Sequence, residues 1–159
     1  MVRPLLPGTA AREARGVVRG ELEREGIPPD AVSDAETVVA ELAGNLELHG
    51  APPYEMRVLR LGRIPAWCEV VDSDPDLGEI PRILARLGAP GPPDLLTESG
   101  RGLLLAHALT AGHCRAYRTR TVSRDTPAKA VAFSLPTAAG PRVLCPPLLD
   151  FGRRLLRFA

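Results

Sequence analysis

The feature that most constrains the fold is an amphipathic run between Asp30 and His49. Its apolar residues recur at steps of three and four, the spacing that brings side chains to one face of an α-helix. These residues are Val32, Ala35, Val38, Val39, Leu42 and Leu46. Asp30 or Ser33 can cap the start of this helix, and Gly50 can end it. The run therefore predicts one long helix with a single apolar face.

Further helices and strands are predicted in separate blocks of the chain. Helix formers between a capping threonine and a terminating glycine predict an earlier helix, and runs of strand formers predict two pairs of strands. The predicted segments are a helix at 9–26, strands at 54–61 and 66–71, a helix opened by Gly102 and ended by Gly112, and strands at 114–121 and 129–135. Helices and hairpins segregated in this way predict an α+β two-layer sandwich.

Residues 75–100 interrupt this pattern with clustered prolines and glycines, leaving room for a short helix at about 79–87. Such a long irregular stretch inside a compact domain favours a functional lid. The 159 residues are enough for one domain, which we place at residues 1–136. The tail, residues 137–159, ends in a basic, leucine-rich stretch that favours a short amphipathic helix or a self-association element.

Composition excludes several classes of function. A formal net charge of +1 gives no strong field for binding nucleic acid or an anionic membrane. No apolar run approaches the roughly 18 residues of a membrane span, and the N-terminus does not resemble a signal peptide, so we expect a cytoplasmic location. The three cysteines, an odd number without a CxxC spacing, favour reduced thiols.

A polar stripe follows the predicted long helix. Glu41, Asn45 and His49 are spaced four residues apart, so they lie along one side of the helix, next to the apolar face. An amide oxygen such as that of Asn45 can bind Mg²⁺, which prefers hard oxygen ligands, and Glu41 can orient or deprotonate a hydroxyl or water. The alternative is an ordinary solvated helix face.

Two other segments carry polar groups at places where chemistry is common. Asp72 ends a predicted strand, and its carboxylate could accept a hydrogen bond from the amino group of a purine, although the following residues also suit a plain turn. Gly100 and Gly102 precede a predicted helix, where backbone N–H groups can approach phosphate oxygens, and Arg101 adds a cation.

The order of these segments resembles the GHKL (Bergerat-fold) ATPase superfamily, and more closely its small anti-sigma-factor and serine-kinase branch. In this resemblance residues 41–50 are the N box, 72–75 the G1 box and 98–105 the G2 box. The resemblance implies a mixed, mostly antiparallel sheet with helices on one face, and ATP with Mg²⁺ bound between the helices and the lid.

The resemblance also implies a role for each motif residue. Glu41 is the implied catalytic base, Asn45 the ligand of Mg²⁺ and phosphate, and Asp72 the partner of adenine. The residues implied to bind the phosphates are Gly100, Arg101, Gly102 and Leu103. Two departures are Asp74-Pro75, where many members have glycines, and Ala130, where a threonine commonly helps to hold adenine through water.

The implied function is that of an ATP-binding regulatory protein with serine/threonine protein kinase activity. Its partner would be a sigma factor or an anti-sigma antagonist, and a homodimer is an option that the family suggests. The two departures leave open a degenerate nucleotide-binding interaction module without kinase activity. A purely structural or interaction domain, in which the motifs are coincidental, is a third alternative.

Overall fold

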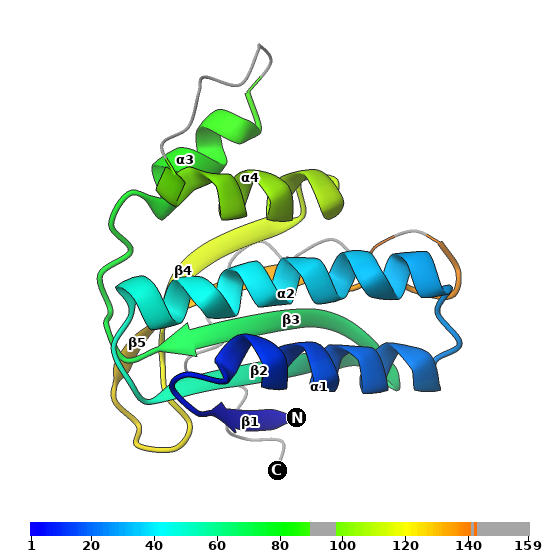
Figure 1. The fold of residues 1–159 in the computed structure, drawn as a ribbon, viewed down its shortest axis with the longest axis horizontal. Helices are drawn as coiled ribbons and strands as arrows, with labels where there is room; N and C mark the ends of the chain where they lie inside the picture. Colours follow the sequence, from blue (N-terminus) through cyan, green and yellow to red (C-terminus); the bar gives the residue numbers. More distant parts are fainter. Residues whose placement is uncertain (90–97, 141, 143–159) are drawn as a thin grey trace.

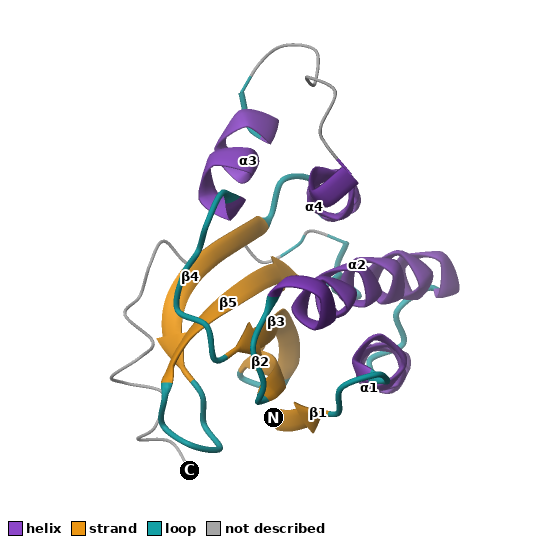
Figure 2. Ribbon diagram, turned by 60° about the vertical axis from the view of Figure 1, so that its left-hand side comes forward, coloured by secondary structure: helices purple, strands orange, loops and turns teal. Residues whose placement is uncertain are grey.

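A computed structural model describes residues 1–89, 98–140 and 142, with only the backbone described at residues 98 and 99. The elements in chain order are β1 (Val2–Leu5), α1 (Ala10–Arg24), α2 (Pro29–His49), β2 (Tyr54–Leu61), β3 (Ile64–Asp72), α3 (Ile80–Leu87), α4 (Glu98–Leu109), β4 (Cys114–Arg120) and β5 (Pro127–Ser134). The helices α1, α2 and α4 lie on one side of the sheet (Figures 1 and 2). The predicted α+β two-layer sandwich is confirmed.

The sheet has five strands in the order β1-β2-β3-β5-β4. All four pairings between them are antiparallel. The edge strand β1 was not predicted from the sequence, because it has four residues and contains Pro4. The amino group of Met1, next to it, donates to the carbonyl oxygen of Val58 at 2.9 Å, which adds a contact beyond the strand itself.

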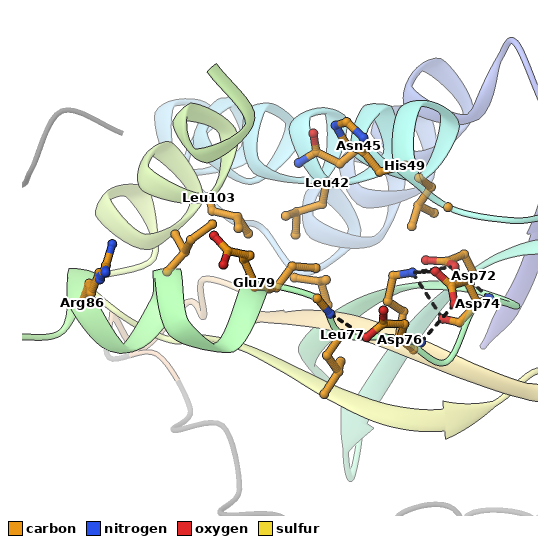
Figure 3. A pocket seen from close by; sticks show the side chains of 17 residues that line it. Leu42, Asn45, His49, Asp72, Asp74, Asp76, Leu77, Glu79, Arg86 and Leu103 are labelled. Carbon is orange, nitrogen blue, oxygen red and sulfur yellow. Dashed lines mark hydrogen bonds and ion pairs between the residues drawn. The ribbon is translucent and has the colours of Figure 1, made fainter. Parts of the chain in front are cut away.

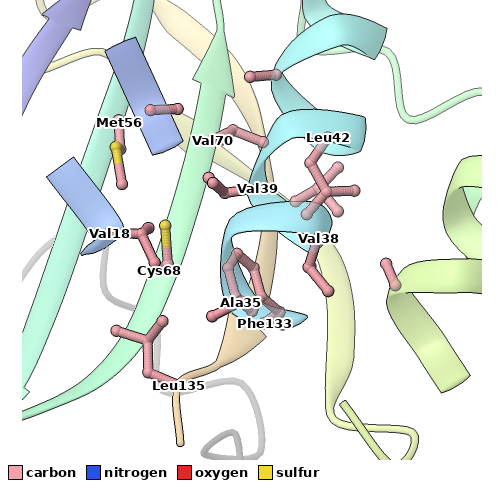
Figure 4. Close-up of a cluster of buried hydrophobic side chains, with 14 of the residues drawn as sticks. Val18, Ala35, Val38, Val39, Leu42, Met56, Cys68, Val70, Phe133 and Leu135 are labelled. Atoms are coloured by element: carbon pink, nitrogen blue, oxygen red, sulfur yellow. The ribbon is translucent and has the colours of Figure 1, made fainter. Parts of the chain in front are cut away.

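The core lies between the sheet and the two long helices (Figure 4). Alternate residues of the central strands face the helices, as the two-residue period of a strand requires. Cys68 and Val70 of β3 and Val131 and Phe133 of β5 belong to the main apolar cluster. The same period directs Asp72 and Lys129, which are partners in the β3–β5 register, to the helix side at the end of the sheet.

The predicted long helix is confirmed as α2, but the expected cap at its start, Asp30 or Ser33, is wrong. The helix begins at Pro29, with Pro28 as the capping residue and no side-chain cap. Proline suits this first helical position because its missing N–H would have no partner there and its φ angle is already helical. The helix ends at His49 before Gly50, as expected.

The other predicted elements are mostly in place. Helix α1 confirms the first helix, β2 and β3 the hairpin, and α3 the short helix. Cys68 and Cys114 are buried, whereas Cys145 and the leucine-rich end of the tail that was predicted to form a helix lie outside the described residues. None of the described helices has the length and hydropathy needed to cross a membrane.

Candidate functional site

A cavity of about 600 Å³ opens where α2, α3 and α4 meet the ends of β3 and β5. Figure 3 shows Asn45 and His49 of α2 above it, Asp72 and Asp74 at one end, and Arg86 of α3 at the other. Small-molecule sites commonly have volumes of about 300–1,000 Å³. The lining consists of Leu42, Asn45, Leu46, His49, Gly50, Asp72, Asp74, Asp76, Leu77, Gly78, Glu79, Ile80, Ile83, Arg86, Leu103, Lys129 and Val131.

Asp72 is the last residue of β3 and is fully buried. Its Oδ1 accepts hydrogen bonds from the backbone N–H groups of Asp74 at 2.9 Å and Ala51 at 3.4 Å, and from Lys129 Nζ at 3.1 Å. Its Oδ2 is buried and has no hydrogen-bond partner among the described residues. A buried acceptor without a donor is costly, so this oxygen is suited to a donor from a ligand or a water.

Three aspartates arrange the chain between β3 and α3. Asp72, Asp74 and Asp76 each accept a hydrogen bond from the backbone N–H two residues further on, at 2.9, 3.0 and 3.0 Å. Such turns let an aspartate side chain replace a backbone acceptor. They explain why this segment can form without the glycines that the resemblance led us to expect at Asp74-Pro75.

Lys129 lies at this end of the cavity, and the sequence analysis did not assign it to the site. It lies opposite Asp72 in the β3–β5 pairing and is buried. Besides Asp72, its Nζ donates to Asp74 Oδ2 at 2.9 Å and to the Asp74 carbonyl oxygen at 3.2 Å. Burial lowers the pKa of Lys129, but the hydrogen bonds and charges of Asp74 and Asp72 outweigh it, so the pKa is raised overall. The signal was present in the sequence, where Lys129 is the only lysine.

Ala130 does not occupy the position that the resemblance gave it. It is fully buried in a separate small cluster with Val71 and Ala128, on the face of the sheet away from the cavity. Since neighbouring residues of a strand point to opposite faces, the residue of β5 that faces Asp72 is Lys129. The expected loss of a hydroxyl contact at Ala130 is therefore not a property of this cavity.

Only part of the polar stripe of α2 lines the cavity. Asn45 and His49 line it, whereas Glu41 is exposed and is not part of the lining. Glu41 instead lies against α4: a Cβ built on Gly102 would come within 3.0 Å of Glu41 Oε2 and 3.3 Å of Asn45 Nδ2. Because Gly102 has no side chain, α4 can approach the two polar residues of α2.

The prediction that Gly102 opens a helix is wrong. Gly100 and Gly102 lie within α4, which already includes Glu98, so the predicted glycine loop before the helix does not exist at these residues. Leu103 lines the cavity, Gly100 is buried, and Arg101 is exposed and outside the lining. The close packing of Gly102 on α2 explains why the helix keeps a residue with poor helix propensity.

The lining is acidic. It contains four carboxylates, from Asp72, Asp74, Asp76 and Glu79, against two permanent cations, Lys129 and Arg86. The hydrogen bond from Lys129, followed by that from the Asp76 N–H, lowers the pKa of Asp74 and favours its charged form. An anionic ligand would therefore need an accompanying cation to lie here.

Comparison with known proteins finds a similar fold among solved structures. No family model and no curated protein matches the sequence. Among solved structures, a chain of the SiaB–SiaC complex from Pseudomonas aeruginosa matches with a TM-score of 0.58 and 12% identity, covering 85% of this chain and 89% of that one. The mycobacterial sensor histidine kinase MprB matches with a TM-score of 0.44 and 15% identity, covering 84% and 98%. At 12% identity the likeness to the SiaB–SiaC chain concerns the fold alone.

Proposed function

We propose that the cavity binds ATP with Mg²⁺, and that the chain is a regulatory protein that acts on a protein partner. The observation that carries the proposal concerns Asp72, which lines a cavity of about 600 Å³. Its Oδ2 is buried and has no hydrogen-bond donor in the part of the chain that the structure describes. The exocyclic amino group of adenine is a donor of the kind this oxygen lacks. The order of the three motifs in the sequence supports the same ligand.

The charges of the lining support binding of the nucleotide as its magnesium complex. Free triphosphate would meet an excess of carboxylates, whereas Mg²⁺ reduces its charge and binds through substrate phosphates, water and one or two protein oxygens. Asn45 lines the cavity and would supply the amide oxygen. The metal would hold the phosphates in place, and Asn45 would fix the position of the metal.

A serine/threonine kinase role is the finer part of the proposal. The motif order resembles that of anti-sigma-factor kinases, and the structural match at a TM-score of 0.58 belongs to a protein found in a complex with another protein. In this role Glu41 would accept the proton of the attacking hydroxyl, and the partner would supply that hydroxyl. A sigma factor or an anti-sigma antagonist is the class of partner that the resemblance implies.

Calorimetric titration of the protein with ATP, with and without Mg²⁺, tests the nucleotide site. We expect Asp72→Asn and Asn45→Ala each to weaken binding by about tenfold or more, the equivalent of roughly 1.4 kcal/mol. The matched control is Asp30→Asn at the exposed start of α2, which should bind like the unmodified protein. Equal affinity in all variants, or no binding at millimolar ATP and Mg²⁺, would refute the site.

The exposed position of Glu41, outside the cavity lining, favours a second candidate function. This is a nucleotide-binding interaction module that contacts its partner without transferring phosphate. The partner can be purified from the native host and incubated with the protein and ATP, and its serines and threonines examined by mass spectrometry. Phosphate on the partner that disappears with Glu41→Gln supports the kinase; a stable, ATP-dependent complex without phosphate supports the module.

A further inference from the structure

Lys129 has no hydrogen to spare for a ligand. Its ammonium group carries three hydrogens, and three protein oxygens lie within 3.2 Å of Nζ: Asp72 Oδ1, Asp74 Oδ2 and the Asp74 carbonyl oxygen. The side chain is only 9% exposed. Although Lys129 lines the cavity, these contacts commit it to the two aspartates.

The contacts of Lys129 help to hold the side chain of Asp72. Three donors converge on its Oδ1, namely Lys129 Nζ and the backbone N–H groups of Asp74 and Ala51. Its Oδ2 receives none of them. The carboxylate is thus held by one oxygen beside a cation, and the other oxygen is left as an acceptor.

A second contact fixes the orientation of this carboxylate. Gly50 lies so close that a Cβ on it would be 2.9 Å from Asp72 Cγ and 3.1 Å from Asp72 Cβ. The backbone at Gly50 therefore confines the carboxylate in addition to its contact with Lys129. Rotation that exchanged its two oxygens would give up the donors on Oδ1.

We propose that Lys129 is the positioning residue that sets base specificity in this cavity, by holding Asp72 through Oδ1 so that Oδ2 is left as the acceptor for the base. Such an oxygen accepts a hydrogen bond from a purine with an exocyclic amino group at position 6. It repels a purine with a carbonyl at that position, because two acceptors then face each other without a proton. This inference rests on the proposed nucleotide site.

Discrimination between ATP and ITP measures this property. The two nucleotides differ only at this edge of the base, where ATP has an amino group at position 6 and an unprotonated N1, and ITP has a carbonyl at position 6 and a hydrogen on N1. A site with a buried group dedicated to one hydrogen bond rejects the analogue that lacks the donor, and we expect the unmodified protein to bind ATP on the order of a hundredfold more tightly than ITP. Binding of each nucleotide with Mg²⁺ is measured by calorimetry at neutral pH.

Lys129→Met tests the role of the lysine, because methionine has a similar length but no charge or donor. Without Lys129, Asp72 loses one of the donors on Oδ1, so its carboxylate can turn and accept the N1–H of ITP in place of the amino group of ATP. We expect the ratio of ATP to ITP affinity to fall about tenfold or more. A purely structural lysine would weaken both nucleotides in parallel, so an unchanged ratio overturns the inference.

Asp74→Asn is the second variant and serves if Lys129→Met does not fold. It neutralises one partner of Lys129 on a side chain that is 39% exposed, and leaves the contact between Lys129 and Asp72 in place. The ratio should then fall by a smaller factor than in Lys129→Met. A protein that binds ATP but shows no preference over ITP overturns this inference and leaves the nucleotide site standing, whereas failure to bind either nucleotide overturns both.

Discussion

Gly50 and Asp72 are in contact where α2 and β3 end, and this contact predicts the effect of a single methyl group. In Gly50→Ala the new Cβ would come within 2.8 Å of the Leu46 carbonyl oxygen and 2.9 Å of Asp72 Cγ. Backbone cannot give way easily, so we expect Asp72 to move, the free energy of unfolding to drop by about 1–3 kcal/mol and ATP binding to weaken. Urea unfolding and calorimetry measure the two effects.

Gly44→Ala is the matched control for this substitution. Gly44 lies in α2, which ends just before Gly50, and a Cβ built on Gly44 meets no atom within 4 Å. Alanine has the higher helix propensity, so this variant should gain up to about 1 kcal/mol. Equal unfolding free energies for the two alanine variants would show that the contact between Gly50 and Asp72 is not tight.

Some residues of the site can be predicted from their spacing in the sequence, and others cannot. Asn45 and Asp72 were predicted from a helix period and from a strand end, and both line the cavity. Lys129 was missed because its role depends on the β3–β5 register, which joins residues 57 positions apart. The same register moves Ala130 to the other face of the sheet, and no motif spacing contains that information.

At the scale of elements, Glu55 of β2 holds the turn that joins β4 to β5. Its carboxylate accepts hydrogen bonds from the backbone N–H groups of Val122 at 2.9 Å and Ser123 at 2.8 Å. It also forms an ion pair with Arg57 at 3.1 Å. Burial raises the pKa of Glu55, but the hydrogen bonds from Ser123, Val122 and Arg57 outweigh it, and the pKa is lowered overall. The charged carboxylate is therefore part of the native fold.

Glu55→Gln should reduce the free energy of unfolding at pH 7 by about 1–3 kcal/mol, because an amide cannot serve as acceptor to all these donors. A carboxyl whose folded pKa lies below its unfolded value of about 4.5 stabilises the fold above that pH. This stabilisation disappears as the pH falls through the lowered folded pKa. Urea unfolding from pH 7 to pH 3 measures this effect. The difference in unfolding free energy between the unmodified protein and Glu55→Gln should become smaller below about pH 4.5.

The matched control for this pH series is Glu23→Gln, on an exposed part of α1. Its unfolding free energy should stay within about 0.5 kcal/mol of the unmodified protein. If the unfolding free energy of Glu55→Gln differs from that of the unmodified protein by the same amount from pH 7 to pH 3, the role assigned to the charged carboxylate is wrong.

The elements differ in how well their sequences define them. The long helix α2 was predicted because six apolar residues repeat with a clear helical period, while the short strand β1 has too few residues to show any period. The start of α4 was misplaced because glycine usually marks a helix boundary, and here it is retained inside the helix for contact with α2. Tertiary packing overrode local preference at that point.

At the scale of the whole molecule, the apolar pattern was enough to predict the layers. The residues of α2 expected to be apolar on one face are all buried, and the core cluster joins them to the alternating residues of β3 and β5. That pattern tolerates many substitutions of similar size, which agrees with a shared fold at 12% identity with the SiaB–SiaC chain. The cavity depends instead on particular polar residues, so its contents could be predicted only in part.

Helix α3 has no buried residue, although it supplies one wall of the cavity. Its Ile80, Ile83 and Leu84 are packed against the core but are only partly buried. Few buried contacts mean that little free energy holds such a helix in place, and it should exchange its amide hydrogens through local opening before α2 does. Any ligand that contacts both helices must supply the free energy of ordering α3, so its measured affinity will be lower than its contacts alone would give.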